Sequence, residues 1–572
     1  MYPKSKSGES QRSSRPRKRQ FHGNRFSDKE NKKEQSASAK KLSSGSSSDI
    51  ICNPLHYYRI VDFITVFGAL AEMLICAQCK QKVKFEESGN RGFGFKLNVV
   101  CHCGRKEINS GPLINTGYEI NRRIVFVMRL LGISREGINI FSGLMDMGQG
   151  LSISTYDLIV RHIHAATSSV FNALSKKAAE EEKRENIKHG RPSTEFKVSG
   201  DGSWKKRGFT SLYGVTTIIG YYTGKVMDFV VKSGYCQACT FWSNKRDTDE
   251  YIEWYEQHEE ECFANHYGSS GKMEVDSIQE MFLRSEEKFG VKYRNYIGDG
   301  DSKTYKGILD CNPYGDDYPV TKSECVGHVE KRMSTRLRNL KKTEKLGGKG
   351  KLTDILIKKL TTYYGLAIRR NVDSVTDMRK AIMATLHHLC STNENPNHDN
   401  CPIGADSWCE WRKAQAAGQE KLFNHPPPLH PDVAKHIRPI YEELSKEDLL
   451  IRCLGGHTQN SNESFNSTVW RLAPKHLNSG LKMIEIAAFI AASIFNEGYS
   501  SILRIMNALQ INVGQQSKFF ADTHDAQRIS RQERRRSSST KEARTACRLV
   551  QMQQNEFHEE AEGLLYGPGI AD

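Results

Sequence analysis

Three acidic motifs that lie far apart in the chain constrain its fold most strongly. They are Gly200-Asp201-Gly202-Ser203-Trp204, Gly298-Asp299-Gly300-Asp301 and Asn462-Glu463-Ser464-Phe465-Asn466. Asp201 and Asp299 each close a run of β-forming residues. A fold that brings three such carboxylates together can hold a pair of hard divalent cations, Mg²⁺ or Mn²⁺, because these ions prefer carboxylate oxygens. The motifs therefore predict a two-metal site suited to phosphoryl transfer.

The residues around the first two motifs predict a mixed β-sheet. The expected order is a strand at 196–201, strands at 212–222 and 225–231, a helix at 277–289 and a strand at 293–298. Three antiparallel strands, a helix and a further strand follow the order of a ribonuclease H-like fold. If the first and fourth strands are neighbours, Asp201 and Asp299 lie side by side at the strand ends.

Taken in order, the motifs resemble those of the Mutator-like transposase domain of eukaryotic cut-and-paste DNA transposons, in the animal branch. The matching segments are Asp201–Trp204, Gly298–Lys303, Cys325–His328 and Thr458–Asn466, and the resemblance covers roughly residues 55 to 500. It implies a DDE recombinase that cuts transposon ends and joins them to target DNA. It also implies an all-helical insertion before the last catalytic helix.

The resemblance further implies a catalytic triad of Asp201, Asp299 and Glu463, accompanied by Cys325 and His328. Asp201 would bridge the two cations, Asp299 would hold one and Glu463 the other. Cys325 and His328 would brace the site. Asp301 remains an alternative to Asp299, because residues two apart on a strand share a face.

The expected fold class is α/β: a ribonuclease H-like catalytic core, a mixed sheet flanked by helices, with a large all-helical insertion and a preceding zinc-ribbon and helical region. The expected segments are a disordered basic tail (1–50), a zinc-ribbon-like region (51–110), a helical region (111–192), the first part of the core (193–345), the helical insertion (346–455), the last part of the core (456–500) and a helical or disordered tail (501–572).

The helical region 111–192 admits two interpretations. An apolar face at 124–131, a break at Gly132-Ile133-Ser134 and a restart at Arg135 suit a DNA-reading helix-turn-helix, and equally any helical hairpin. The charged stretch 176–192 indicates a helical linker that ends at Gly190-Arg191-Pro192.

Cysteine spacing predicts structural zinc. The pairs Cys76/Cys79 and Cys101/Cys103, separated by about 20 β-rich residues, match a zinc ribbon, although His102 could replace one thiolate. A second site is expected from Cys236, Cys239, Cys262 and His266, with His258 as a spare ligand. Cys390, His398, Cys401 and Cys409 form a looser set, for which we favour ordinary buried thiols over a third zinc site.

The charge predicts a polyanionic partner, either nucleic acid or an acidic membrane surface. The net charge is +16, and residues 1–50 carry 13 Lys/Arg against 5 Asp/Glu, half of that excess. We expect this tail to grip phosphates, and Arg15-Pro16-Arg17-Lys18-Arg19 resembles a nuclear localisation signal. No run of about 18 apolar residues appears, so no membrane partner is expected.

Two functions from different classes follow. The first is an active transposase that acts on double-stranded DNA, both transposon ends and target, as a homo-oligomer. The alternative is a domesticated, catalytically inactive protein that binds DNA sequence-specifically. The intact triad favours the first, and a general phosphodiesterase is a third option.

Overall fold

The computed structural model describes residues 36–42, 50–206, 210–300, 302–348, 350–405 and 407–536. One compact unit spans Lys40–Ala526, and the described residues before and after it belong to a second unit. Most of the basic tail, including the Arg15–Arg19 motif, lies outside the described residues. Within them, no helix is both long and apolar enough to cross a membrane.

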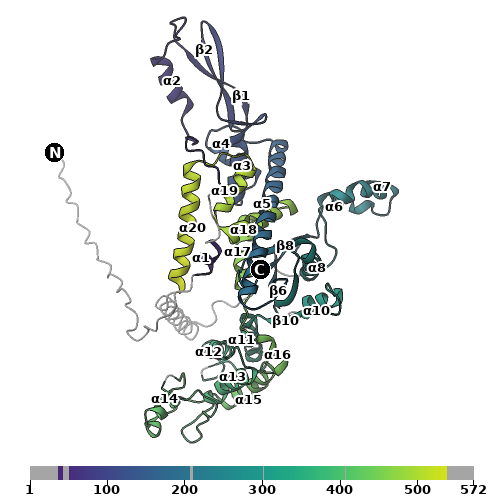
Figure 1. Ribbon diagram of the computed structural model, residues 1–572, viewed down its shortest axis with the longest axis vertical. Helices are drawn as coiled ribbons and strands as arrows, with labels where there is room; N and C mark the ends of the chain where they lie inside the picture. The colour runs from purple at the N-terminus through teal and green to yellow at the C-terminus, as the bar shows by residue number, and fades with distance from the viewer. Residues whose placement is uncertain are drawn as a thin grey trace, which may run out of the picture. The chain divides into compact units, whose positions relative to one another are not determined.

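A five-stranded mixed sheet forms the centre of the larger unit (Figure 1). Its strands are β6 (Glu195–Trp204), β7 (Tyr213–Gly220), β8 (Val226–Ser233), β9 (Lys292–Gly298) and β10 (Thr321–Glu324). They lie in the order β10-β9-β6-β7-β8, with β6, β9 and β10 parallel and β7 antiparallel to both of its neighbours. The sheet confirms the α/β class with a mixed sheet, including the meander and the fourth strand.

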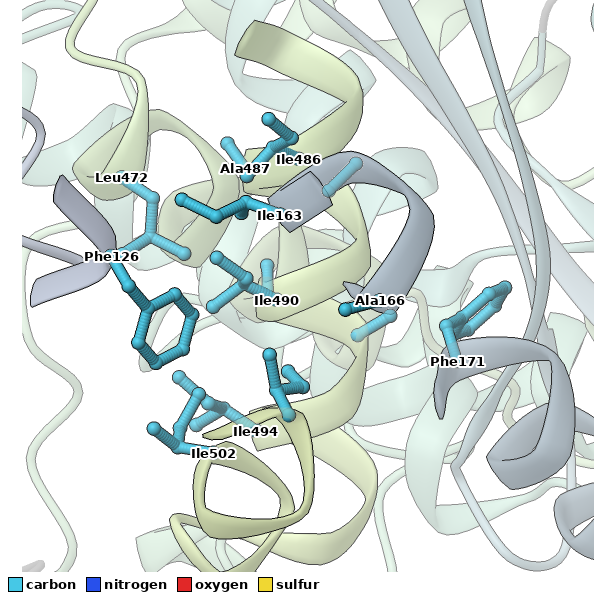
Figure 2. Packing of buried hydrophobic residues seen from close by; sticks show 14 of the residues in the cluster. Phe126, Ile163, Ala166, Phe171, Leu472, Ile486, Ala487, Ile490, Ile494 and Ile502 are labelled. Atoms are coloured by element: carbon cyan, nitrogen blue, oxygen red, sulfur yellow. The ribbon is translucent and has the colours of Figure 1, made fainter. Parts of the chain in front are cut away.

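Helices cover both faces of this sheet, so β7 is buried at every position. On one face, Ile218 packs in a core with residues of α8 (Ser270–Leu283). On the other face, its neighbour Ile219 joins a core that includes α5 (Ile153–Lys188) and α18 (Leu481–Glu497). Figure 2 shows Ile163 and Ala166 of α5 beside Ile490 of α18. The alternation of neighbouring side chains across a strand explains the two separate cores.

The stretch 176–192 is helical as expected, because α5 continues through it to Lys188, but part of it is buried. Ala178, Ala179 and Glu182 are buried, and Glu182 accepts hydrogen bonds from the backbone amides of Tyr222 and Thr223. The charged residues of this stretch therefore include one that fixes the turn between β7 and β8.

The expected helical hairpin before α5 is present as α3 (Glu119–Leu130) and α4 (Arg135–Leu144). Its apolar face was misplaced in part: Val127 and Leu131 are 41% and 62% exposed, whereas Val125 and Phe126 are fully buried. That this hairpin reads DNA stays a prediction.

The region 51–110 contains α2 (Phe63–Met73) and a three-stranded antiparallel sheet. Its strands are β1 (Lys84–Arg91), β2 (Gly94–Cys101) and β3 (Gly104–Asn109), and a small hairpin of β4 (Leu113–Ile114) and β5 (Gly117–Tyr118) follows.

The insertion between β10 and the last acidic motif is helical and has a hydrophobic core of its own. It is built on α11 (Val326–Thr343) and contains α12 (Asp354–Arg370), α13 (Val375–Leu389), α14 (Glu410–Ala416), α15 (Pro431–Glu443) and α16 (Glu447–Cys453). The chain then returns to the sheet through α17 (Asn460–Leu472). The remaining helices are α1 (Ala37–Leu42), α6 (Gln237–Phe241), α7 (Asp249–His258), α9 (Ser285–Phe289), α10 (Ser302–Cys311), α19 (Ser500–Ala508) and α20 (Gln515–Arg536).

Candidate active site

Asp201 and Asp299 lie on neighbouring strands at matching positions. The last parallel pair between β6 and β9 joins Ser199 to Ile297, and each aspartate lies two residues beyond its member of that pair. One detail of the sequence prediction is wrong: Asp201 does not end its strand. β6 continues to Trp204, because it keeps its pairing with β7 after the pairing with β9 has ended.

Glu463 comes to the same edge on α17, which buried amides dock onto the sheet. Asn462 accepts a hydrogen bond from Ser199 Oγ at 2.7 Å and donates to the Ser199 carbonyl and to Thr217 Oγ1, both at 3.2 Å. One turn further on, Asn466 Nδ2 donates to Asp201 Oδ2 at 2.8 Å. The position of Glu463 is therefore set by its helix neighbours.

His328, near the start of α11, lies between the acids. Its Nδ1 is 3.9 Å from Asp299 Oδ1, and its Nε2 is 3.9 Å from Glu463 Oε1. Gln459 orients the ring: its Nε2 donates to the Gly200 carbonyl at 2.6 Å, which turns its Oε1 toward His328 Nδ1 at 2.9 Å. One imidazole ring thus lies within 4 Å of two acids that are 164 residues apart in sequence.

The charges of this cluster perturb one another. Burial raises the pKa of Asp201 from 3.8 to about 6, with repulsion from Glu463 and Asp299 adding to it and His328 opposing it. A hydrogen bond with Cys325 raises the pKa of His328 to about 9 against burial, and Asp299 adds to the rise. Burial opposes ionisation of Cys325, but hydrogen bonds from the side chain and backbone of His328 outweigh it and lower the Cys325 pKa.

This cluster gives a pH prediction for protein without added Mg²⁺ or Mn²⁺. Because the folded-state pKa of Asp201 is raised, its ionisation disfavours folding; the effect is absent below about pH 4 and complete above about pH 6. At pH 7.5 the free energy of unfolding of Asp201→Asn should therefore exceed that of wild type by at most about 3 kcal/mol, and its melting temperature should be higher. At pH 4 the two proteins should unfold alike. Thermal melts of both proteins across this range test it; a difference that does not change with pH would contradict it.

A basic groove borders the acids. An open cavity of about 410 Å³ is lined by Asp299, His328, Lys331, Arg332, Thr335 and Arg336. Lys331 Nζ is 3.1 Å from Glu463 Oε1, and Arg332 lies 3.9 Å from Asp299. Cations on successive turns of α11 give this groove a positive surface next to the carboxylates.

Two other acids near this edge form ion pairs with arginines. Glu324 is almost fully buried and pairs with Arg332 at 2.6 Å, and Glu330 pairs with Arg369 at 2.5 Å. Asp301, the alternative to Asp299, lies outside the described residues, so the choice between these two stays open.

The four cysteines Cys76, Cys79, Cys101 and Cys103 converge, with their sulfur atoms within 4.8 Å of one another. Each pair lies on a tight turn: the Cys76 carbonyl accepts from the Lys80 amide, and Gly104 follows Cys103 with a φ of 133°. Four thiolates in this arrangement could bind zinc. His102 is not part of the cluster.

The second cluster contains Cys236, Cys239 and Cys262, but its histidine is His258 and not His266. His258 Nε2 is 3.3 Å from Cys236 Sγ at the end of α7. His266 is buried away from the thiols, where its Nδ1 lies 3.2 Å from Asp276 Oδ2. The C-x3-H pattern favoured His266, four residues after Cys262, but His258, the spare ligand, lies four residues before Cys262. The end of α7 brings His258 to the first cysteine pair.

The third set also converges, against the expectation of ordinary buried thiols. His398, Cys401 and Cys409 come together, and His388 takes the place assigned to Cys390. His388 is on the last turn of α13, and residues two positions apart on a helix point about 200° apart, so Cys390 faces elsewhere. These four residues could bind a metal as well.

The sequence interpretation missed Gln459, Asn462 and Asn466 as positioning residues. The signal was present, because 459, 462, 463 and 466 follow the spacing of one helix face, and three of these residues carry amides. Buried amides on a helix that must dock onto strand edges are typical of a polar interface.

A mixed sheet that gathers carboxylates at one edge, beside a cationic helix, suits proteins that act on phosphodiesters. A family model described as Mutator-like transposase matches residues 57–409. The chain therefore belongs to the Mutator-like transposase family, which implies an enzyme that cuts and transfers DNA. No curated protein matches it. The matched range contains Asp201, Asp299, Cys325 and His328 but ends before Glu463, so the third acid rests on geometry and motif resemblance.

Proposed function

We propose that this protein is a DDE transposase with a ribonuclease H-like core, which cleaves transposon ends and transfers the strands by two-metal catalysis. The observation that carries the proposal is the approach of Asp299 and Glu463 to His328, next to Asp201 on the adjoining strand. The strand order supports the core assignment, since a three-stranded meander is extended on its first strand by two parallel strands.

The residues at the sheet edge fit divalent cations. Three carboxylates lie close enough for Glu463 and Asp299 to raise the pKa of Asp201, a repulsion that bound cations would relieve. Asp201, which feels the charge of both other acids, is suited to be a shared ligand, and Asp299 and Glu463 would each hold one ion. The chemistry that a bound Mg²⁺ or Mn²⁺ pair supplies at such a site is activation of the attacking oxygen and stabilisation of the leaving oxygen.

The chain itself supplies positioning and positive charge. Lys331, Arg332 and Arg336 line the groove beside Asp299, where a DNA phosphate can be gripped and oriented. Gln459 holds His328 with its Nδ1 occupied, so the ring keeps one orientation. We expect the partner to be double-stranded DNA, both transposon ends and target, bound by a homo-oligomer in the nucleus.

Incubation of the full chain with its flanking genomic repeats tests the proposal. Nicks at the repeat ends, dependent on Mg²⁺ or Mn²⁺, are expected. Sequence-specific binding without any nick in either metal would instead favour a domesticated DNA-binding protein.

Removal of residues 1–50 should weaken non-specific DNA binding and flatten its salt dependence. The segment carries 13 cationic residues against 5 acidic ones, and each lost phosphate contact lowers the slope of log K against log salt by about 0.9. Titrations of random and repeat-containing duplexes at several salt concentrations measure the non-specific affinity and its salt dependence. Preference for the repeat should survive; its complete loss would place the sequence reader in the tail.

Cys76→Ser should unfold the 51–110 region alone. Structural zinc contributes roughly 10 kcal/mol or more to a small domain, and three thiolates hold it far less tightly than four. We expect one zinc ion fewer per chain and protease cleavage confined to this region. Cys52→Ser is the matched control, because Cys52 lies outside the cluster. Protease resistance and zinc content equal to those of the control would exclude a structural site here.

A further inference from the structure

The segment between α13 and α14 is not held by the apolar core of the helical insertion. Its described residues from 391 to 409 form neither helix nor strand. The buried apolar core of the insertion draws on α11, α12, α13, α15 and α16, but on no described residue between Ser391 and Gln419. Ile403 is even 82% exposed. Something other than apolar burial must hold this segment in place.

Four ligand atoms meet where this segment crosses the end of α13. The Nδ1 atoms of His388 and His398 are 3.2 Å apart. Cys409 Sγ lies 3.5 Å from each of these nitrogens, and Cys401 Sγ lies 3.9 and 3.8 Å from them. His398, Cys401 and Cys409 are buried.

These separations are the edges of a tetrahedron of the size that zinc requires. With zinc–nitrogen and zinc–sulfur bonds of about 2.0 and 2.3 Å, a tetrahedral ion sets nitrogen–nitrogen edges of about 3.3 Å and nitrogen–sulfur edges of about 3.6 Å. In a chance cluster of hydrogen-bonded side chains, each pair of atoms would meet separately. Such a cluster would not place all four atoms around one point. Two thiolates would also neutralise the charge of the ion.

The surroundings orient the ligands as they do at structural zinc sites. His398 turns its other nitrogen, Nε2, to His425 Nε2 at 2.9 Å, and His425 Nδ1 lies 2.9 Å from Asn393 Oδ1. The Arg412 amide donates to Cys409 Sγ at 3.5 Å. Trp411 stacks on the His398 ring at 4.8 Å. A hydrogen-bond partner on the far nitrogen of a ligating histidine fixes its tautomer and orientation.

We propose that His388, His398, Cys401 and Cys409 form a third zinc site, which pins the 391–409 segment to α13 in place of a hydrophobic core. His425 acts as a positioning residue through His398. The site is independent of the proposed catalysis, because it lies in the insertion with its own core and uses none of the residues assigned to the active site.

Zinc analysis of the purified full chain tests the proposal. Wild type should carry three zinc ions per chain, and Cys409→Ser should carry two, with new protease cleavage between residues 391 and 409. Cys390→Ser is the matched control, since this neighbouring cysteine lies outside the cluster, and it should keep three ions. Equal zinc content in Cys409→Ser and Cys390→Ser would overturn the site.

A second variant tests the proposal even if Cys409→Ser does not fold. His425→Ala leaves all four ligands in place and removes only the partner of His398 Nε2. It should bind three zinc ions but release one of them to a competing chelator with an affinity about 10- to 100-fold weaker than in wild type. His436→Ala, at a half-exposed histidine on α15, is its control. Identical zinc release from His425→Ala, His436→Ala and wild type would contradict the role of His425 and, with it, the zinc-bound form of His398.

Discussion

Asp201→Asn is expected to abolish strand cleavage while leaving DNA affinity nearly unchanged. Asp201 is the carboxylate shared between the two proposed cation positions, and an amide oxygen cannot replace its charge. The substitution conserves shape, and the asparagine oxygen can still accept the hydrogen bond from Asn466. We expect cleavage to fall at least about 10³-fold, the scale on which loss of one member of a catalytic set acts.

Asp432→Asn is the matched control, because Asp432 is an exposed acid at the start of α15 in the insertion. Both variants should bind a repeat-containing duplex with the affinity of wild type, since the cationic groove on α11 is intact in each. Mg²⁺ or Mn²⁺ should raise the melting temperature of wild type and of the control but not that of Asp201→Asn. Equal nicking by Asp201→Asn and the control would refute the assignment of Asp201.

The parts of the fold that sequence reasoning predicted well are those that local patterns determine. The β-forming runs before Asp201 and Asp299 and the turn at Thr223-Gly224 specify strands and a hairpin within a few residues. The helical insertion, which the resemblance implied, is present as α12 to α16. Only the parallel pairing of β6 with β9 required the assumption that two strands with 87 residues between them (205–291) are neighbours.

The errors arise where a long-range contact overrides a local pattern. The charged stretch near Glu182 resembles a solvated linker, yet Glu182 is buried because backbone amides of the β7–β8 turn need an acceptor. His258 was named only as a spare ligand and His388 was not named, because spacing alone does not show which of several nearby residues faces a metal site. The ends of α7 and α13 direct these two histidines toward the thiols, and this placement depends on how the two helices pack.

The same contrast applies to the proposed active site. The acids can be recognised in the sequence by their Asp-Gly and Asn-Glu-Ser motifs. The residues that hold them in place are amides that no single motif explains. Gln459 connects Gly200 to His328, and Asn462 connects α17 to Ser199 and Thr217. Their importance follows from burial, because a buried polar group must find partners, and these amides find theirs on β6 and β7.

Asn462→Ala should therefore be among the most damaging substitutions outside the acids. It leaves the Ser199 carbonyl, Ser199 Oγ and Thr217 Oγ1 without their amide partner in a fully buried position. Each such loss costs about 1 kcal/mol or more, so we expect the free energy of unfolding to fall by about 3 kcal/mol.

The same substitution should reduce cleavage under conditions in which the protein is still folded. Glu463 is the next residue on α17, and a shift of that helix by about 1 Å is enough to lower a positioned reaction roughly 10²-fold. Asn460→Ala, at an exposed position on the same helix turn, should change the unfolding free energy by no more than about 0.5 kcal/mol and leave cleavage intact. Urea unfolding of both variants, with cleavage assays at 10 °C below the melting point of the weaker one, separates the two effects. If Asn462→Ala lost stability but cleaved as Asn460→Ala does, α17 would not set the position of Glu463, and the third acid would have to be sought elsewhere.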